Sequence, residues 1–290
     1  MANKTVVVWA NCQGGPLTSA LRDMHSEDFD VHWFMNYEFI KNGLELPAFM
    51  KTADIFLYQN YRPQELIMYD LDWISRNILP AHCQKVSFPT LHSITLQFCH
   101  DYQEPNNSKT QGPDLPHGAF FYGIKPLADY YVDLVKDSKT KEDRICRIPE
   151  AVSHALTDTF IPLADIEYHK KRSLDFLHEK SLQSNTRGIY DYIVDNYRSV
   201  RLWHNPYHPN GILLDELCRQ VFEAIGLPYR PGPGFLSYLD NHLKDWVLPI
   251  LPSVQAGIGL NAGTYCESKY HPEISTTEAY LSKYLQCLYV

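Results

Sequence analysis

Several common site signatures are missing from this chain of 290 residues. No G-x-G-x-x-G fingerprint for a dinucleotide is present, and no G-K-[ST] completes a phosphate-binding loop of the Walker A type. The seven cysteines are odd in number and never have C-x-x-C spacing. These absences argue against a dinucleotide site, a structural zinc site and a disulfide framework, and they predict free thiols.

Long apolar runs and clusters of positive charge are missing as well. No run approaches the roughly 20 apolar residues of a membrane span, and no basic N-terminal region precedes an apolar one. We therefore expect no membrane span and a cytoplasmic location. The formal net charge is −8, with Lys and Arg scattered along the chain. This pattern argues against nucleic acid as a partner and leaves open a local basic pocket for a phosphorylated cofactor.

Strand and helix patterns alternate over the first ninety residues. The run "TVVVWA" is apolar without alternation, as in a strand that is buried on both faces of a parallel sheet. The patterns predict strands at 4–10, 29–37, 53–61 and 84–91, with helices at about 16–25 and 63–79. Because strands that alternate with helices form parallel sheets, we predict an α/β fold.

The remainder of the chain is mostly helical in pattern. Residues 92–118 are rich in proline, glycine and asparagine, which is typical of a functional loop or lid. Helices are predicted at about 125–137, 149–157, 162–184, 186–197, 212–227 and 276–288, with a late strand at 199–203. No internal repeat or low-complexity tract is present.

A cysteine stands where the first predicted strand passes into a helix. In doubly wound sheets the ligand binds outside the carboxyl ends of the strands, and Cys12 lies on the turn that follows the first strand. Pro16 suits the first position of a helix, so the residues before it would present free N–H groups that favour a thiolate, an oxyanion or a phosphate. This position predicts a lowered thiol pKa and a nucleophile.

Two readings of the cysteine remain open at this point. Gly14 and Gly15 leave room for a substrate to approach the backbone beside a nucleophilic Cys12. The alternative is that Cys12 is a small packing residue, since free cysteine is often buried.

A nucleophile of this kind needs a base, and the segment "WHNPYHPNG" supplies two imidazoles, His204 and His208. The spacing H-x-x-x-H also occurs in paired metal ligands, but Pro206 and Pro209 argue against a helix and therefore against a metal site. The alternative is that one or both imidazoles only bond loop backbone. Asp215 and Glu216 follow nearby, yet neither can be assigned as the acidic partner of a histidine.

Five segments carry a resemblance to a known family. They are "VVWANCQGGPLTSAL", "ADIFLYQNYR", "VSFPTLHSI", "LWHNPYHPNGILLDEL" and "VLPILPSVQAGIGL". In this order they resemble the "GNCQ" opening and the later segments of the capsular polysaccharide biosynthesis acetyltransferases, whose SGNH-like first subdomain binds coenzyme A. Ala10 stands where that family has glycine, and "NPYHP" is longer by two residues than the family's "NHP".

The resemblance implies a fold and a division of the chain. The fold is an α/β parallel-sheet core of the SGNH-like (flavodoxin-like) type with an additional, mostly helical C-terminal part. Residues 1–290 would form a single α/β domain, in which 1–120 are the SGNH-like subdomain and 121–290 an extension that completes the site.

The resemblance also assigns residues. It implies that Cys12 is the reactive group and that His208 is the matching histidine. The residues expected to line the pocket for substrate or coenzyme A are Asn11, Gln13, Gly14, Gln59, Arg62, His204 and Asn205. Arg62 is suited to clamp a phosphate or carboxylate because its guanidinium is bidentate. As an alternative, Gln59 and Arg62 only cap the strand end.

The implied reaction is O-acyl transfer from acetyl-CoA to a saccharide or nucleotide-sugar hydroxyl in surface polysaccharide biosynthesis. Cys12 would carry the acyl group in a ping-pong route, or His208 would activate the sugar directly, and in either route the amides at 12–15 would stabilise the oxyanion. The rivals are a cysteine esterase or deacetylase of the same layout, a non-catalytic glycan-binding protein, and a sulfotransferase or glycosyltransferase, which would need a phosphate-binding loop.

Overall fold

A computed structural model of the chain shows two compact units, each built from separate stretches of sequence. It describes residues 3–59, 70–93, 96–98, 102–103, 123–261, 265–268 and 272–289. The first unit comprises Met1–His92, Phe176–Asp195 and His208–Leu243, and the second comprises Ser93–Asp175, Asn196–Tyr207 and Lys244–Val290. The subdomain boundary expected near residue 120 stays a prediction.

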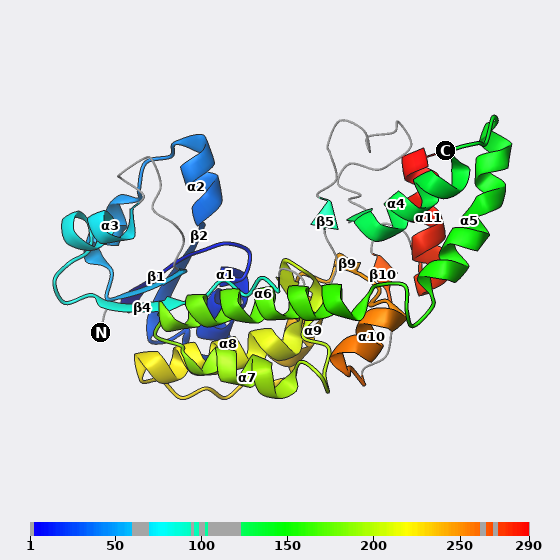
Figure 1. The fold of residues 1–290 in the computed structure, drawn as a ribbon. Helices are drawn as coiled ribbons and strands as arrows, with labels where there is room; N and C mark the ends of the chain where they lie inside the picture. The colour runs from blue at the N-terminus through cyan, green and yellow to red at the C-terminus, as the bar shows by residue number, and fades with distance from the viewer. Residues whose placement is uncertain are drawn as a thin grey trace. The chain divides into compact units, whose positions relative to one another are not determined.

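The first unit contains a parallel sheet (Figure 1). The order of its strands is β2-β1-β3-β4. Its strands are β1 (Lys4–Ala10), β2 (Phe29–Met35), β3 (Ile55–Gln59) and β4 (Gln84–Phe88). The central strand β1 is buried along its whole apolar run, because helices cover both faces of the sheet. The chain leaves β1 towards β2 on one side and returns to β3 on the other, so a topological switch point lies between β1 and β3.

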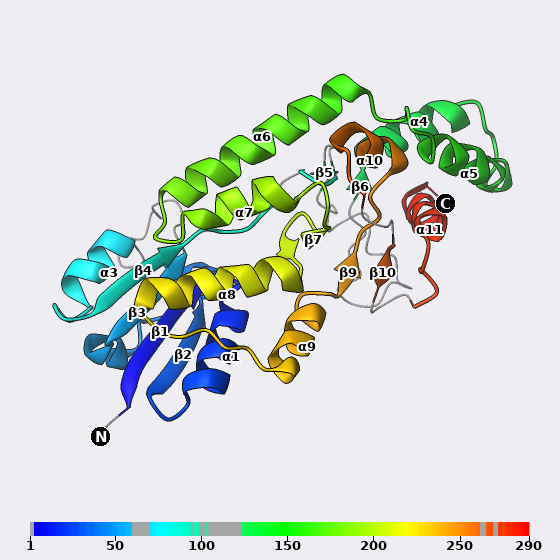
Figure 2. The same cartoon turned by 90° about the horizontal axis from the view of Figure 1, so that it is seen from below.

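Helices of the first unit lie on both faces of this sheet. They are α1 (Gly14–His25), α2 (Asn36–Asn42), the 3-10 helix η1 (Ala48–Thr52), α3 (Leu71–Asn77), α7 (Gly188–Asn196), α8 (Gly211–Ile225) and α9 (Pro233–Asn241). On one face, Val7, Trp9 and Phe56 pack with residues of α2, η1 and α3. On the other face lie α1 and α8 (Figure 2). Burial of these apolar side chains provides the main driving force for folding.

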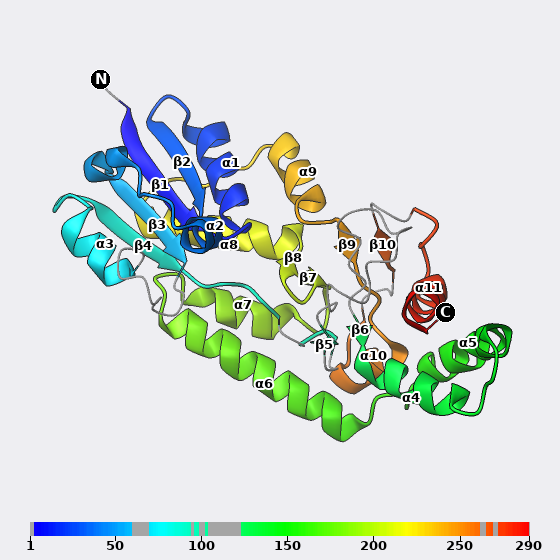
Figure 3. The same ribbon diagram turned by 90° about the horizontal axis from the view of Figure 1, so that it is seen from above.

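The second unit is built from helices and short antiparallel strand pairs. Its helices are α4 (Lys125–Val135), α5 (Lys141–Ala155), α10 (Pro252–Ile258) and α11 (Thr277–Tyr289). Its strands are β5 (Tyr102–Gln103), β6 (Gly123–Ile124), β7 (Trp203–Asn205), β9 (Trp246–Val247) and β10 (Glu267–Ser268). The helices α4, α5 and α11 pack together (Figure 3). Strand β8 (His208–Pro209) belongs to the first unit, and the residues of α6 (Leu163–Leu182) are divided between both units.

The predicted α/β fold with a parallel sheet is confirmed. The strand predicted at 199–203 is wrong, because the Gln97 side chain bonds the backbone there: its Nε2 donates to the Tyr197 and Val200 carbonyls, and its Oε1 accepts from the Leu202 N–H. A strand begins only at Trp203. Helix α5 begins eight positions before the predicted start at residue 149. Thr140 caps it by accepting the Asp143 N–H, and Pro149 lies inside it.

Two predicted elements fall largely outside the described residues. Of the helix predicted at 63–79, the structure describes only the part from residue 70 onward. Most of the loop predicted at 92–118 also lies outside them. Among the helices that are described, none is long and apolar enough to cross a membrane.

Candidate functional site

The turn after β1 is closed by local hydrogen bonds. The Asn11 side chain accepts the Gln13 N–H at 2.9 Å, and the Asn11 carbonyl accepts the Gly14 N–H at 2.9 Å. The Gly15 N–H donates to the Cys12 carbonyl at 3.3 Å. Helix α1 therefore begins at Gly14, and the expected first helical position of Pro16 is wrong. The amides of Gln13, Gly14 and Gly15 have partners within the turn, in contrast to the free amides expected there.

A buried network of side-chain amides joins this turn to the neighbouring strands. Gln13 is completely buried, and its Oε1 accepts both the Gln59 Nε2–H and the Leu91 N–H at 3.0 Å. The Gln59 Oε1 in turn accepts the Asn11 N–H at 2.8 Å. Gln59 is the last residue of β3, so the network spans the switch point between β1 and β3. It fixes the backbone on both sides of Cys12.

The thiol of Cys12 is partly buried, and its pKa differs from the expected one. Burial raises the pKa of Cys12 to about 11, although hydrogen bonds from the backbone N–H groups of Cys12 and Gln13 lower it. The prediction of a lowered thiol pKa is therefore wrong. The reason is that desolvation of the thiolate outweighs the contribution of two amide dipoles. At neutral pH the thiol keeps its proton, so a nucleophilic role would require a base.

The space beside the two glycines is filled by other side chains. A Cβ at position 14 would lie 2.6 Å from the Trp33 Nε1 and 2.9 Å from the Ala10 Cβ. A Cβ at position 15 would lie 3.1 Å from the His242 ring. The close approach of Trp33 and His242 explains why both positions are glycine, and it occupies the room expected there for a substrate.

His208 lies in the same unit as Cys12. It occupies β8, two residues before Asn210, whose side chain caps α8 by accepting the Leu213 N–H at 3.2 Å. His208 interacts electrostatically with His92, and burial together with this interaction lowers the pKa of His92 to about 4. His92 is the residue after Leu91, whose N–H donates to the Gln13 side chain.

His204 and Asn205 belong to the second unit, and each is buried. The His204 carbonyl accepts the Leu248 N–H at 2.8 Å and an Arg201 N–H at 2.9 Å. The Asn205 Nδ2 donates to the Trp246 carbonyl at 3.1 Å. These contacts connect backbone segments of the second unit. A role for either residue in binding substrate stays a prediction.

Three further residues considered from the sequence are Arg62, Asp215 and Glu216. Arg62 lies outside the described residues. Asp215 accepts the Tyr229 hydroxyl at 2.6 Å, and Glu216 forms an ion pair with Arg219 at 2.6 Å. The two acids that follow the histidine segment therefore have partners of their own on or beside α8.

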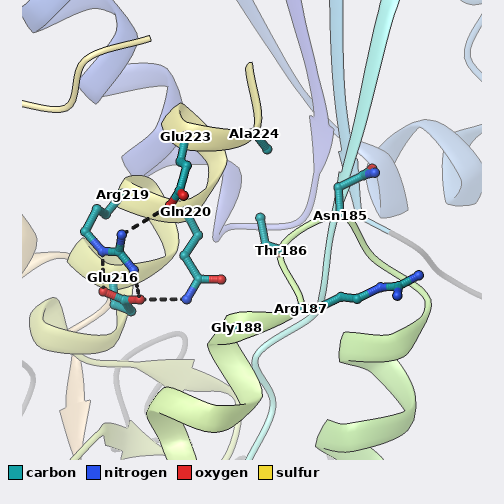
Figure 4. A pocket seen from close by; sticks show the side chains of 9 residues that line it. All are labelled: Asn185, Thr186, Arg187, Gly188, Glu216, Arg219, Gln220, Glu223 and Ala224. Carbon is teal, nitrogen blue, oxygen red and sulfur yellow. Dashed lines mark hydrogen bonds and ion pairs between the residues drawn. The ribbon is translucent and has the colours of Figure 1, made fainter. Parts of the chain in front are cut away.

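One cavity of about 500 Å³ lies in the first unit, between the start of α7 and α8 (Figure 4). Its lining residues are Asn185, Thr186, Arg187, Gly188, Glu216, Arg219, Gln220, Glu223 and Ala224. None of the site residues expected from the sequence lines it. Arg219 is paired with Glu216 and Glu223, and Gln220 donates to Glu216, so these charges are largely compensated within the cavity wall.

The residues that the structure describes were compared with two further kinds of reactive site, a metal centre and a free thiol. They contain no group of three or more His, Cys, Asp and Glu that could hold a metal ion. Free cysteines among them include Cys12, Cys83, Cys146, Cys218 and Cys266.

Comparison with solved structures gives one informative match. The sequence matches no protein-family model and no curated protein. The structure is similar to that of WcbI, described as a novel polysaccharide biosynthesis enzyme, with a TM-score of 0.64 and 18% sequence identity. The match covers 99% of this chain and 90% of WcbI, which was solved as the native protein without a disulfide bond between coenzyme A and one of its cysteines. The chain has the fold of WcbI.

Two residues that adjoin the Cys12 turn, Trp33 and His242, were not predicted, and neither was the buried imidazole of His92. The position of "PTLH" just after a predicted strand gave a weak signal for His92, because residues that follow β4 lie at the same edge of the sheet as Cys12. Trp33 and His242 gave no sequence signal. His242 lies 230 positions from Cys12, and only the tertiary fold brings it to the turn.

Proposed function

We propose that this protein transfers an acyl group from coenzyme A to a sugar hydroxyl in polysaccharide biosynthesis. The observation that carries the proposal is the place of Cys12. It follows β1 at the switch point of a parallel sheet, where doubly wound folds bind their ligands, and a buried amide network holds its turn rigid. Rigid support of this kind is what a reacting group needs.

The similarity to WcbI supports the choice of substrate class. Both chains share one fold over nearly their whole length, and WcbI is described as a polysaccharide biosynthesis enzyme in connection with coenzyme A and a cysteine. The fold alone is compatible with many activities, so the residues of the Cys12 turn have to decide between them. The specific resemblance of "NCQ" and "HP" in this sequence to the acetyltransferase motifs supports the acyl-transfer chemistry.

In a covalent route, Cys12 would be the nucleophile and His208 the general base and acid. His208 takes the thiol proton while the Cys12 Sγ bonds to the acyl carbonyl carbon, and the bond from that carbon to the sulfur of coenzyme A breaks. Coenzyme A leaves as a thiol with the proton from His208. The sugar hydroxyl then passes its proton to His208, its oxygen bonds to the acyl carbon, and the bond to Sγ breaks as the thiol is reprotonated.

The raised pKa of Cys12 makes the base indispensable to this route. With a pKa of about 11, only about one thiol in 10⁴ is ionised at pH 7. The alternative is direct transfer, in which His208 deprotonates the sugar hydroxyl and its oxygen attacks the thioester without a cysteine adduct. A neutral Cys12 thiol is compatible with both routes, and variants distinguish them.

The experiment is a calorimetric titration with coenzyme A, followed by turnover of acetyl-CoA with sugar acceptors. We expect saturable binding by the wild type, retained by Cys12→Ser and His208→Ala. In turnover, His208→Ala should lose about 10² to 10⁴ in rate in either route. Cys12→Ser should lose a comparable factor only in the covalent route, whose acyl-enzyme is visible as a mass increase on the Cys12 peptide.

Exposed residues provide matched controls. Cys146→Ser changes an exposed thiol in α5, and His82→Ala changes an imidazole whose side chain is 65% exposed. Both variants should keep wild-type binding and turnover. Absence of coenzyme A binding up to millimolar concentration would overturn the proposal. If the acyl group were released to water at a rate independent of any sugar, the protein would be a hydrolase and not a transferase.

A further inference from the structure

His242 contacts the backbone of the Cys12 turn. Its Nε2 lies 3.3 Å from the Cys12 carbonyl oxygen. A carbonyl can only accept a hydrogen bond, so this Nε2 carries a proton. His242 follows the last residue of α9, where its N–H donates to the Tyr238 carbonyl, and its ring packs against the Tyr238 ring with centroids 5.1 Å apart. The imidazole therefore packs against Tyr238 while its Nε2 contacts the Cys12 carbonyl.

Two further features belong to this contact. The ring of His242 lies 3.1 to 3.3 Å from where a Cβ of residue 15 would be, so glycine at that position admits the ring. The next residue, Leu243, has a φ of 60°, in the left-handed region that non-glycine residues rarely adopt. It is the only non-glycine residue with a positive φ in the described part of the chain. Such strain, on the order of 1 kcal/mol, persists where surrounding contacts impose it.

The contact determines the direction of one peptide group. In a trans peptide the C=O of residue 12 and the N–H of residue 13 point in opposite directions. The Cys12 carbonyl accepts from His242 and from the Gly15 N–H. On the opposite side, the Gln13 N–H donates to the Asn11 side chain, and it lies close enough to the Cys12 sulfur to lower the pKa of the thiol. A donor on the carbonyl therefore fixes the amide that faces the thiol, and it polarises that amide into a stronger donor.

We propose that His242 is a positioning residue for Cys12, which holds the Cys12–Gln13 peptide so that its N–H faces the sulfur. The imidazole acts through the peptide and not on a substrate. Loss of the Nε2–H donor should weaken the stabilisation of the thiolate and leave Cys12 less reactive at a given pH. This inference concerns the thiol itself, so it holds whether or not coenzyme A is the substrate.

The test is the pH dependence of Cys12 alkylation by iodoacetamide, followed by mass spectrometry of the Cys12 peptide. His242→Phe keeps a ring and removes the donor, whereas His242→Gln keeps an N–H donor. We expect His242→Phe to slow alkylation about 3- to 10-fold at fixed pH, as for a thiol pKa raised by half a unit to one unit. His242→Gln should stay within about twofold of the wild type, because hydrogen bonding at the carbonyl is retained.

Further variants separate this effect from a general loss of structure. Gly15→Ala adds the Cβ that displaces the ring and should slow alkylation as His242→Phe does. His25→Phe removes a similar contact, from the His25 Nε2 to the Pro228 carbonyl at 3.2 Å, and should leave Cys12 unchanged. Exposed Cys146 serves as the reference thiol in every sample. An unchanged Cys12 profile in His242→Phe, or an equal slowing in His242→Gln, would overturn the proposal.

Discussion

The turn after β1 is partly buried and the segment 201–205 of the second unit is fully buried, and different side chains hold them. Neutral amides of Gln13 and Gln59 support the first, and each bonds both backbone and the other amide. A cation supports the second: Arg201 donates to the carbonyls of Trp203, His204, Tyr265 and Leu248, and its guanidinium lies near the rings of Phe98 and Tyr265.

The difference has a physical reason. A buried amide offers one donor group and one acceptor, so it can join N–H and C=O groups of neighbouring strands without adding charge. A guanidinium offers only donors and suits a place where several carbonyls converge. Neutral support leaves the field around Cys12 to be set by nearby imidazoles and peptide dipoles. Cationic support is better suited to a segment whose role is to join loops.

The largest effect is expected from the cationic support. Arg201→Met would leave four carbonyls without this donor, three of them from the buried residues Trp203, His204 and Leu248, and we expect it to lower the free energy of unfolding by about 3 to 5 kcal/mol. Urea denaturation measures this change. Arg198→Met, at an exposed arginine three positions earlier, should cost less than about 1 kcal/mol. Equal losses in the two variants would contradict the role given to Arg201.

The amide support should rank next. Gln13→Met keeps the side-chain volume but leaves the Gln59 Nε2–H and the Leu91 N–H without their acceptor. We expect a loss of about 2 to 4 kcal/mol in unfolding free energy. Adding Gln59→Met removes the Gln59 Nε2–H, one of the two donors left without an acceptor. The double variant should therefore lose less unfolding free energy than the sum of the losses in the two single variants. Strict additivity in a double-mutant cycle would show that the two amides act independently.

The pH dependence of the unfolding free energy tests the first region separately, because the imidazole of His92 lies next to Leu91, which bonds the amide network. Burial and His208 lower the pKa of His92 to about 4, below the usual value of 6.5. Between these values the unfolded chain binds a proton that the folded chain does not, so stability is complete above pH 6.5 and falls as the pH drops towards 4. The loss is on the order of 2 to 3 kcal/mol.

Urea denaturation at pH 7 and pH 4.5 tests this dependence. His92→Gln should remove most of the difference between the two pH values, whereas His82→Gln, on the exposed surface, should leave it as in the wild type. If His92→Gln lost as much stability as the wild type on acidification, the effect would have to come from other groups.

The smallest effect distinguishes crowded from open glycines. Gly14→Ala would bring a methyl group against Trp33 and Ala10, and we expect it to cost about 1 to 2 kcal/mol. Gly234 lies in α9 with open space around its Cα, so Gly234→Ala should raise stability by about 0.5 kcal/mol. In thermal unfolding, the Tm of Gly14→Ala should therefore fall and the Tm of Gly234→Ala should rise.

The parallel sheet could be predicted because its signals are local. The run "TVVVWA" marks β1, and the glycines and proline that follow mark the start of α1 within two residues. Strand β7 could not be placed, since the side chain of Gln97 displaces it by bonding the backbone of residues 197–202. Short-range pattern carries no information about a bond between residues a hundred positions apart.

The candidate site was predictable to a similar extent. Cys12 and Gln13 follow β1, Gln59 is the last residue of β3, and the structure joins the two glutamines by a hydrogen bond. The thiol pKa was predicted in the wrong direction, because a sequence shows the turn but not how much solvent the fold removes. His242 could not be found, since nothing near it in the chain indicates that it reaches residue 12.

The first unit is built from three separate stretches of the chain, so it cannot be completed until the last of them has been synthesised. Gln84 bonds the carbonyl of Ala224 across 140 positions, and His242 meets Cys12 across 230. Contacts of such high contact order close large loops and form late in folding. During synthesis the ribosome releases all strands of the parallel sheet well before α8, which covers one of its faces. In that interval the apolar face of the sheet is exposed on the nascent chain, where chaperones can bind it, and the turn around residue 12 is completed only after His242 has been synthesised.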